Sequence, residues 1–393
     1  MQTAQLTHCD HSVANSKFCR LQSSRSSATG VKRRKLSHQS CTHHCWNVTS
    51  AVIHHSALAA TQRSRHSRNR CIEASKTVCK SSIHEHMEGH ADPVISSAWL
   101  AEHLEDVAIL DVRGSVRTKL QSTNAQGCRL EMSEYFADYD TYLEGHIPGA
   151  TFFDWTKDGV DEEEETPVQL QIDSDTFAAE MEAKGVGTDR PVVVYDSGNG
   201  LLAPRVWWCL SYHGHPAPLI LDGGYARWVE EGRSTDLAEP CPLTVYATFE
   251  PQPQPHRRAT SGDMLQALND KQDGKDIMIL DARGLEQYTG EVKRAERGGH
   301  IPGAVNVSRK SLLDKSTGLL RPLQDQRQVF EDAGVDCSGN GSQQIYTYCN
   351  GGVASCSLTL ALHRLGLGQH CVNYDGSWNE WGNELQLPVQ TGK

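Results

Sequence analysis

The segment that decides the fold is Tyr348-Cys349-Asn350-Gly351-Gly352-Val353-Ala354-Ser355. The residues before it, 344–348, are rich in β-branched and aromatic side chains and predict a strand. The residues after it, 355–365, repeat apolar side chains at helical spacing. The segment is therefore a short loop from strand to helix, with two glycines that permit backbone conformations closed to other residues. Such units build parallel sheets covered by helices.

Cys349 begins this loop and is the candidate nucleophile. The loop can curl so that its amide N–H groups point at one atom, and the positive end of the following helix adds to their effect. Such a pocket favours the thiolate, which is the reactive form of cysteine, and would hold a persulfide anion equally well. An ordinary buried cysteine at a strand end is the alternative, which the glycine-rich loop disfavours. The residues predicted to form the anion-binding loop around Cys349 are Asn350, Gly351, Gly352, Val353, Ala354 and Ser355.

The chain contains two copies of one pattern: residues 109–114 match 279–284, residues 145–150 match 299–304, and residues 221–228 match 374–381. Asp196 precedes Asp222 by 26 residues, and Cys349 precedes Asp375 by 26 residues. Asp196 in the first copy thus has the position of Cys349 in the second. Only the second copy can perform thiol chemistry at this position.

Short apolar runs and helical patterns alternate over most of the chain. Strands are predicted at 107–111, 192–195, 218–221, 276–280 and 344–348, and helices at 203–213 and 355–365. We therefore expect an α/β protein with two domains at 90–237 and 261–388, each a parallel sheet flanked by helices. Residues 238–260 contain five prolines and predict a semi-rigid linker.

Composition limits the classes of function. The net charge of −11 combines +9 in residues 1–90 with −20 in the remainder, and an acidic body argues against nucleic acid as a partner. No apolar run approaches the roughly 18 residues that span a bilayer, so no membrane partner is expected. Six of the 13 cysteines lie in the first 90 residues, and they are interpreted as reduced thiols of an intracellular protein.

Residues 1–89 lack hydrophobic periodicity and are rich in Arg and Ser, with one acidic residue, Asp10, before Glu73. That composition is typical of an organelle transit peptide, which would direct the protein to a mitochondrion or plastid. A disordered extension without an address is the alternative, and it would leave the protein in the cytoplasm.

Together, the repeated Gly-His-Ile-Pro-Gly-Ala motifs at 145–150 and 299–304, Ala-Pro-Arg-Val-Trp-Trp at 203–208, the Cys349 loop and Tyr-Asp-Gly-Ser-Trp at 374–378 resemble the tandem rhodanese family. The family includes thiosulfate and 3-mercaptopyruvate sulfurtransferases, and the resemblance covers residues 91–388. It implies two rhodanese-like domains, an inactive first copy and an active site at the domain interface.

The resemblance also implies a reaction in two steps. Cys349 takes sulfane sulfur from thiosulfate or 3-mercaptopyruvate as a persulfide and passes it to cyanide, a small thiol or thioredoxin. Neither a metal nor an organic cofactor is required.

The loop after Cys349 carries no cation, which favours 3-mercaptopyruvate over the dianion thiosulfate as donor. The family usually has a substrate-binding arginine where this chain has Gln287. Lys293, Arg294 and Arg297 are the nearby cations in sequence, and Arg294 is the predicted substitute.

Two other classes of function are alternatives. A Cys-based phosphatase needs an arginine six residues after its nucleophile to bind phosphate oxygens in pairs, and Ser355 stands there. A non-catalytic persulfide-binding or sensor module would keep Cys349 without turnover. His146 and His300 occur in both copies and are interpreted as scaffold, and Cys356 is interpreted as a packed helix residue rather than a resolving thiol.

Overall fold

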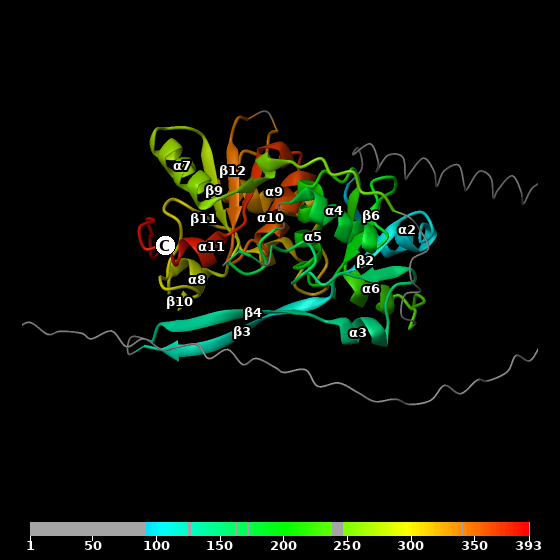
Figure 1. Cartoon of the computed structure of the whole chain (residues 1–393). Coiled ribbons are helices and arrows are strands. Elements are labelled where there is room, and N and C mark those ends of the chain that lie inside the picture. The colour runs from blue at the N-terminus through cyan, green and yellow to red at the C-terminus, as the bar shows by residue number, and fades with distance from the viewer. Residues whose placement is uncertain are drawn as a thin grey trace, which may run out of the picture. The chain divides into compact units, whose positions relative to one another are not determined.

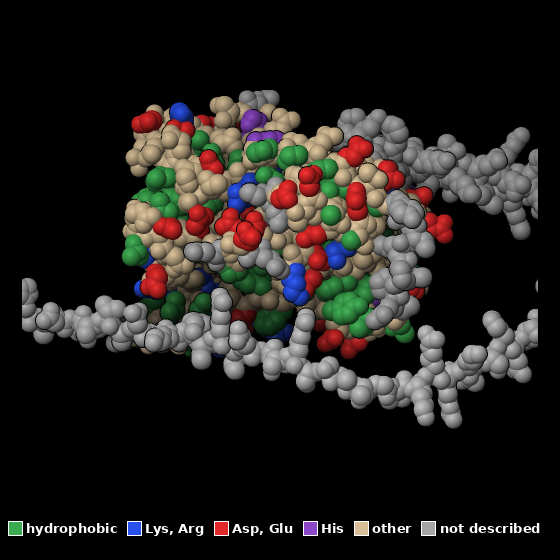
Figure 2. All heavy atoms as spheres, in the orientation of Figure 1, with side chains coloured by type: hydrophobic (Ala, Val, Ile, Leu, Met, Phe, Trp, Pro, Cys, Tyr) green, Lys and Arg blue, Asp and Glu red, His purple; other side chains and the backbone are tan. Residues whose placement is uncertain are grey.

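The computed structural model describes residues 92–124, 127–161, 163–164, 166–170, 173–237, 247–339 and 341–392 (Figure 1). The predicted extension at 1–89 lies outside the described residues. Within the described part, no helix is both long and apolar enough to cross a membrane. On the face shown in Figure 2, the Asp and Glu side chains of this part are spread over much of the surface.

The first domain is built on a five-stranded parallel sheet with the order β1-β7-β6-β2-β5. Its strands are β1 (Val94–Ile95), β2 (Ala108–Asp111), β5 (Ala150–Phe152), β6 (Val192–Tyr195) and β7 (Pro218–Leu221). Its helices are α2 (Ser97–Glu102), α3 (Tyr139–Glu144), α4 (Ser174–Ala183), α5 (Ala203–Tyr212) and α6 (Gly224–Glu230). The strands predicted at 107–111, 192–195 and 218–221 are confirmed because each is a short apolar run buried within the sheet.

The second domain repeats this arrangement in a parallel sheet with the order β11-β9-β12-β13-β8. Its strands are β8 (Arg258–Ala259), β9 (Ile277–Asp281), β11 (Val305–Asn306), β12 (Gln344–Tyr348) and β13 (Cys371–Tyr374). Its helices are α7 (Ser261–Gln272), α8 (Leu285–Thr289), α9 (Leu323–Asp332), α10 (Ser355–Arg364) and α11 (Ser377–Trp381). Strand β12 takes the place of β6, and β9 that of β2, so the two copies share one topology.

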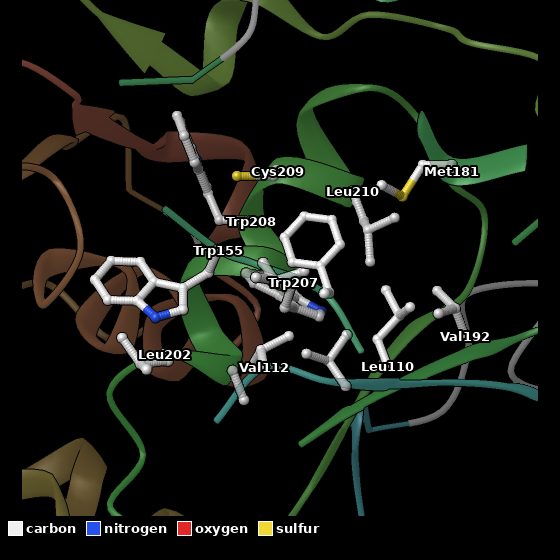
Figure 3. Close-up of a cluster of buried hydrophobic side chains, with 14 of the residues drawn as sticks. Leu110, Val112, Trp155, Met181, Val192, Leu202, Trp207, Trp208, Cys209 and Leu210 are labelled. Atoms are coloured by element: carbon white, nitrogen blue, oxygen red, sulfur yellow. The ribbon is translucent and has the colours of Figure 1, made fainter. Parts of the chain in front are cut away.

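The two domains meet through α5 and α10. Leu360 and Cys356 of α10 belong to the same buried apolar cluster as Trp207 and Val206 of α5. Figure 3 shows part of this cluster, with Trp207 and Trp208 among the core side chains of the first domain. Because the helix that follows Cys349 is packed in this cluster, the first domain supports the loop of the second.

A long hairpin that the sequence did not predict also joins the domains. Strands β3 (Gly114–Thr123) and β4 (Arg129–Ala137) are antiparallel, and β4 pairs in parallel with β10 (Val292–Lys293) of the second domain. Figure 1 shows the hairpin reaching from the first domain to α8 and β10. Its residues therefore lie beside the second domain although the chain places them in the first.

The described part of the stretch predicted as a linker is docked on both domains. The side chain of Phe249 is buried, and the Gln252 amide donates to the His213 carbonyl over 2.8 Å. Further on, β8 pairs with β13 as an edge strand of the second sheet. Strand β8, which lies within the stretch predicted as a linker, is therefore part of the second sheet. Residues 238–246 lie outside the described part.

Candidate active site

Cys349 lies at the carboxyl end of β12 and starts the loop that leads into α10. Its side chain is almost buried, with 3% of the residue exposed. The Ser355 hydroxyl donates toward the Cys349 sulfur over 3.6 Å. The sequence predicted this strand–loop–helix arrangement, and the loop brings Ser355, the first residue of α10, back to the sulfur.

Ser377 fixes the curvature of the loop. Its Oγ accepts hydrogen bonds from the amides of Cys349, over 3.1 Å, and of Gly352, over 3.0 Å, and donates to the Tyr374 carbonyl. Ser377 itself has a φ of 52°, a conformation that is costly for a non-glycine residue and that often marks a functional site. The sequence analysis did not single out Ser377, although the Tyr-Asp-Gly-Ser-Trp motif contains it.

Gly352 is required for a close approach of two backbones. Its φ is +70°, and a Cβ there would lie 2.5 Å from the Asp375 carbonyl oxygen. A side chain at Gly352 would push the loop away from β13, because backbone atoms cannot move aside as a flexible side chain can.

Behind the loop, a buried ion pair ties the domains together. Arg205 of α5 contacts the Asp375 carboxylate over 2.6 Å and also donates to the carbonyls of Gly352 and Val168. Burial alone would raise the pKa of Asp375, but the guanidinium groups of Arg205 and Arg258 lower it below its ordinary value of 3.8. The pair thus holds a charged carboxylate directly against the loop.

In the first copy, the loop equivalent to the Cys349 loop binds the Asp196 side chain. The Asp196 carboxylate accepts hydrogen bonds from the amides of Gly198, Leu201, Leu202 and Ala203, over 2.8 to 3.2 Å. These amides belong to the loop that leads into α5 and to the first residue of α5. This loop corresponds to the loop between Cys349 and α10 in the second copy. An anionic side chain therefore occupies the amide pocket in this copy, as the sequence analysis expected for the Cys349 thiolate.

The hairpin brings Tyr135 to the Cys349 loop. A Cβ on Gly351 would lie 3.1 Å from the Tyr135 hydroxyl and 2.9 Å from the Asn379 side-chain nitrogen. That nitrogen donates to the Tyr135 hydroxyl over 3.2 Å, and the Asn379 backbone amide donates to the Asn350 carbonyl. Sequence reasoning missed Tyr135, because a residue 214 positions before Cys349 in another domain gives no local signal.

A cavity of about 430 Å³ lies beside Tyr135 and Asn379. It is lined by Met132, Ser133, Tyr135, Glu164, Thr166, Pro167, Gln169, Arg294, Asn379, Glu380, Asn383 and Glu384. Arg294 is the one Lys or Arg in this lining, which also holds three carboxylates. The cavity is therefore polar and acidic rather than cationic.

The other predicted site residues have partners in the structure. Arg294 contacts Glu131 over 3.1 Å, and its terminal nitrogens donate to Ser133 and to Thr118. The Gln287 side-chain oxygen accepts a hydrogen bond from the Asn350 side chain over 2.9 Å. Gln287 thus lies at the loop, whereas Arg294 lies in the cavity wall with its charge balanced by Glu131.

The residues interpreted as scaffold have the same partners in both copies. The imidazole of His146 stacks on Tyr142, and that of His300 stacks on Tyr288. Each ring nitrogen Nδ1 bonds the carbonyl of the tyrosine on which the ring stacks. Cys356 is fully buried, its thiol donates to the Gly352 carbonyl, and burial raises its pKa well above the ordinary range. These contacts support packing roles.

Known proteins share this architecture. The family model for the rhodanese-like domain matches residues 96–231 and 264–384. The sulfur carrier protein TtuD of Thermus thermophilus is 31% identical, with 77% of this chain and 98% of that protein covered. The 3-mercaptopyruvate sulfurtransferase of Escherichia coli is 31% identical, with 76% and 98% covered. The crystal structure of SseA from Escherichia coli, described as a 3-mercaptopyruvate sulfotransferase with the rhodanese fold, gives a TM-score of 0.60 at 31% identity, covering 73% of this chain and 99% of SseA. The chain therefore belongs to the rhodanese family, with both copies of the domain on one polypeptide.

Proposed function

We propose that Cys349 is the nucleophile of a sulfur transfer and carries the sulfur as a persulfide. The chain is a sulfurtransferase of the thiosulfate/3-mercaptopyruvate type, as are its curated relatives. The observation that supports Cys349 most directly is the match between the two loops. The first holds the Asp196 carboxylate by four amides, and the second presents a thiol at the same position.

The reaction has two displacement steps. The Cys349 thiolate attacks the outer sulfur of the donor, the bond from that sulfur to the donor breaks, and pyruvate or sulfite leaves. The outer sulfur then passes to an acceptor such as cyanide, a small thiol or thioredoxin, and the thiolate returns. Negative charge on the sulfur would be stabilised in both forms of the enzyme by Ser355 Oγ and by the loop amides whose counterparts bind Asp196 in the first copy.

We propose 3-mercaptopyruvate as the preferred donor. The cavity beside Tyr135 has carboxylates from Glu164, Glu380 and Glu384, and its one arginine is paired with Glu131. A dianion such as thiosulfate therefore meets more uncompensated repulsion there than a monoanion does. Arg309 is a further cation that interacts electrostatically with Asp196 and Cys349. It lines a different cavity, beside Asp196, and donates to the Asn199 carbonyl.

The donor is tested by comparing kcat/KM for 3-mercaptopyruvate and thiosulfate with cyanide as acceptor. Each missing charge-assisted hydrogen bond is worth roughly 1.5–3 kcal/mol, hence about tenfold or more in rate. We expect at least a tenfold preference for 3-mercaptopyruvate and a shift toward thiosulfate in Asn350→Arg. Equal use of both donors by the unmodified protein would contradict this choice, and replacing Lys293, Arg294 and Arg309 singly would then identify the cation.

The nucleophile is tested by mass spectrometry after incubation with donor. We expect an adduct of about 32 Da, one sulfur atom, on Cys349 and the loss of transfer in Cys349→Ser. Cys128→Ser is the control, because Cys128 is a partly exposed cysteine away from the loop. Full activity of Cys349→Ser would refute the proposal. A stoichiometric persulfide without turnover would favour the sensor module instead.

We propose an organelle address in residues 1–89. A relative from Arabidopsis thaliana, 28% identical, is named as a mitochondrial thiosulfate/3-mercaptopyruvate sulfurtransferase. The Arg- and Ser-rich composition of residues 1–89 fits a mitochondrial or plastid transit peptide. Fusion of these residues to a fluorescent protein tests the address, and diffuse cytoplasmic fluorescence would show an extension without one.

A further inference from the structure

The hairpin β3–β4 brings Tyr135 of the first domain close to the Cys349 loop. Contacts with Trp155 and Asn379 help to hold Tyr135 in this position. Its ring meets the edge of the Trp155 ring at 5.9 Å, and its hydroxyl accepts from the Asn379 side chain. Tyr135 lines the cavity, and its hydroxyl lies close to Gly351, two residues after Cys349.

Resting on the proposed function, we infer that Tyr135 contacts the substrate: its hydroxyl donates a hydrogen bond to the carbonyl oxygen of the sulfur donor as that oxygen becomes an enolate. The hairpin would then select donors that have such an oxygen. Asn379 and Trp155 fix the direction of the hydroxyl.

The electrostatics of Tyr135 suit a donor rather than a base. Burial raises the pKa of Tyr135 above its ordinary value of 10.0, although hydrogen bonds with Asn379 and Ser133 partly lower it. Charge on the Cys349 sulfur raises the pKa further. The hydroxyl therefore keeps its proton at neutral pH and can donate while the thiolate is present.

The step balances without a further reactant. The Cys349 thiolate forms a bond to the donor sulfur, and the bond from that sulfur to the donor's methylene carbon breaks. The electron pair of the broken bond enters the adjacent carbonyl, giving the enolate of pyruvate. The thiol proton of the donor moves to the methylene carbon, so the products are pyruvate and the persulfide anion. Tyr135 keeps its proton and stabilises the transient charge on the enolate oxygen.

Comparing the two donors separates a role in the reaction from a purely structural one, because a structural residue should affect both donors equally. When thiosulfate is the donor, sulfite leaves directly and no enolate forms. Tyr135→Phe should keep the ring contact with Trp155 and lose only the hydroxyl. Single-turnover formation of the Cys349 persulfide is then measured by mass spectrometry with each donor, in the full chain.

We expect the rate with 3-mercaptopyruvate to fall by about tenfold to a hundredfold in Tyr135→Phe, with KM changed by less than about twofold, because the contact strengthens only in the transition state. The rate with thiosulfate should stay within about twofold. Tyr139→Phe is the matched control, since Tyr139 is an exposed tyrosine just after the hairpin; it should change neither rate.

An equal loss with both donors would show that the hydroxyl only shapes the loop, and no loss would show that it takes no part. Either result overturns the inference while the persulfide on Cys349 still supports the proposed function. A wild-type protein that forms no persulfide on Cys349 would instead refute that function.

Discussion

Replacing Arg205 tests how far the first domain holds the active-site loop in place. Arg205 is 3% exposed and Asp375 is 0% exposed, and their contact is 2.6 Å long. The same guanidinium donates to Gly352 in the loop and to Val168 in the first domain. In Arg205→Met the apolar stem is retained and all three interactions are lost.

The expected loss in the free energy of unfolding follows from leaving Asp375 buried without Arg205. Removing one member of a buried ion pair typically costs about 3–5 kcal/mol, because the other charge remains buried and uncompensated. Arg258 still contacts Asp375 over 3.2 Å, so we expect the lower end of that range. A loss of about 3 kcal/mol corresponds to a fall in Tm of about 6–12 °C for a domain of this size.

The assays are thermal denaturation, for Tm, and chemical denaturation, for the free energy of unfolding, of wild type, Arg205→Met and Arg227→Met. Arg227 also pairs with carboxylates from a helix of the first domain, but its side chain is 41% exposed. Exposed pairs contribute about 0–1 kcal/mol, so Arg227→Met should unfold almost as wild type does. Equal losses in the two variants would refute the reasoning, because burial would then make no difference.

The pH dependence provides a second check on the same pair. The pKa of Asp375 is lower in the folded protein than its ordinary value of 3.8, so its charged form stabilises the fold above that pH. This contribution is lost as the pH falls from 3.8 through the folded pKa. Of the two arginines, Arg205 has the larger electrostatic effect on Asp375, and Arg205→Met removes it. The difference in the free energy of unfolding between wild type and this variant should therefore become smaller below pH 3.8. A difference that widens in acid would contradict the assignment.

Three further outcomes are expected. Asp196→Ala should leave the persulfide on Cys349 intact, as measured by mass spectrometry. It should lower the free energy of unfolding, measured by denaturation, by about 1–3 kcal/mol, because four amides lose their acceptor. Gly352→Ala should reduce turnover by about tenfold or more. The added Cβ would lie 2.5 Å from the Asp375 carbonyl oxygen, and an alanine in the left-handed conformation costs about 1–2 kcal/mol. Unchanged kinetics would show that the loop adapts to the side chain. A chain that begins at His90 should keep the melting temperature and turnover of the full chain, because residues 1–89 lack the apolar pattern needed to offset the entropy of ordering; a large loss of stability would contradict this.

The sequence predicted the sheets and the loop because both depend on local patterns. Buried parallel strands are short apolar runs, and those at 192–195 and 344–348 appear at the predicted places. The equal spacing to Asp222 and Asp375 aligned Asp196 with Cys349, and the structure places both residues at the carboxyl ends of equivalent strands.

The hairpin escaped prediction because its stability comes from distant contacts. Strand β3 is polar and largely exposed. Strand β4 alternates between exposed and half-buried side chains, but polar Glu131 and Ser133 are half-buried while Met132 and Phe136 are exposed, so its sequence lacks the apolar–polar alternation that marks a half-buried strand. One edge of β4 pairs with β10, more than 150 residues later in the chain. The neighbours of Tyr135 and Arg294 follow from that pairing, which no local pattern indicates.

These contacts show how the first copy, which has Asp196 at the position of Cys349, supports the loop of the second copy. The first copy supplies Arg205, which donates a hydrogen bond to the Gly352 carbonyl, and Tyr135, whose hydroxyl lies close to Gly351. A loop with two glycines has little stiffness of its own. Because α10 is also packed against α5, the first domain supports the loop through Arg205, Tyr135 and the contact between these two helices. The first copy therefore helps to shape the surroundings of Cys349, although it has a carboxylate at the equivalent position.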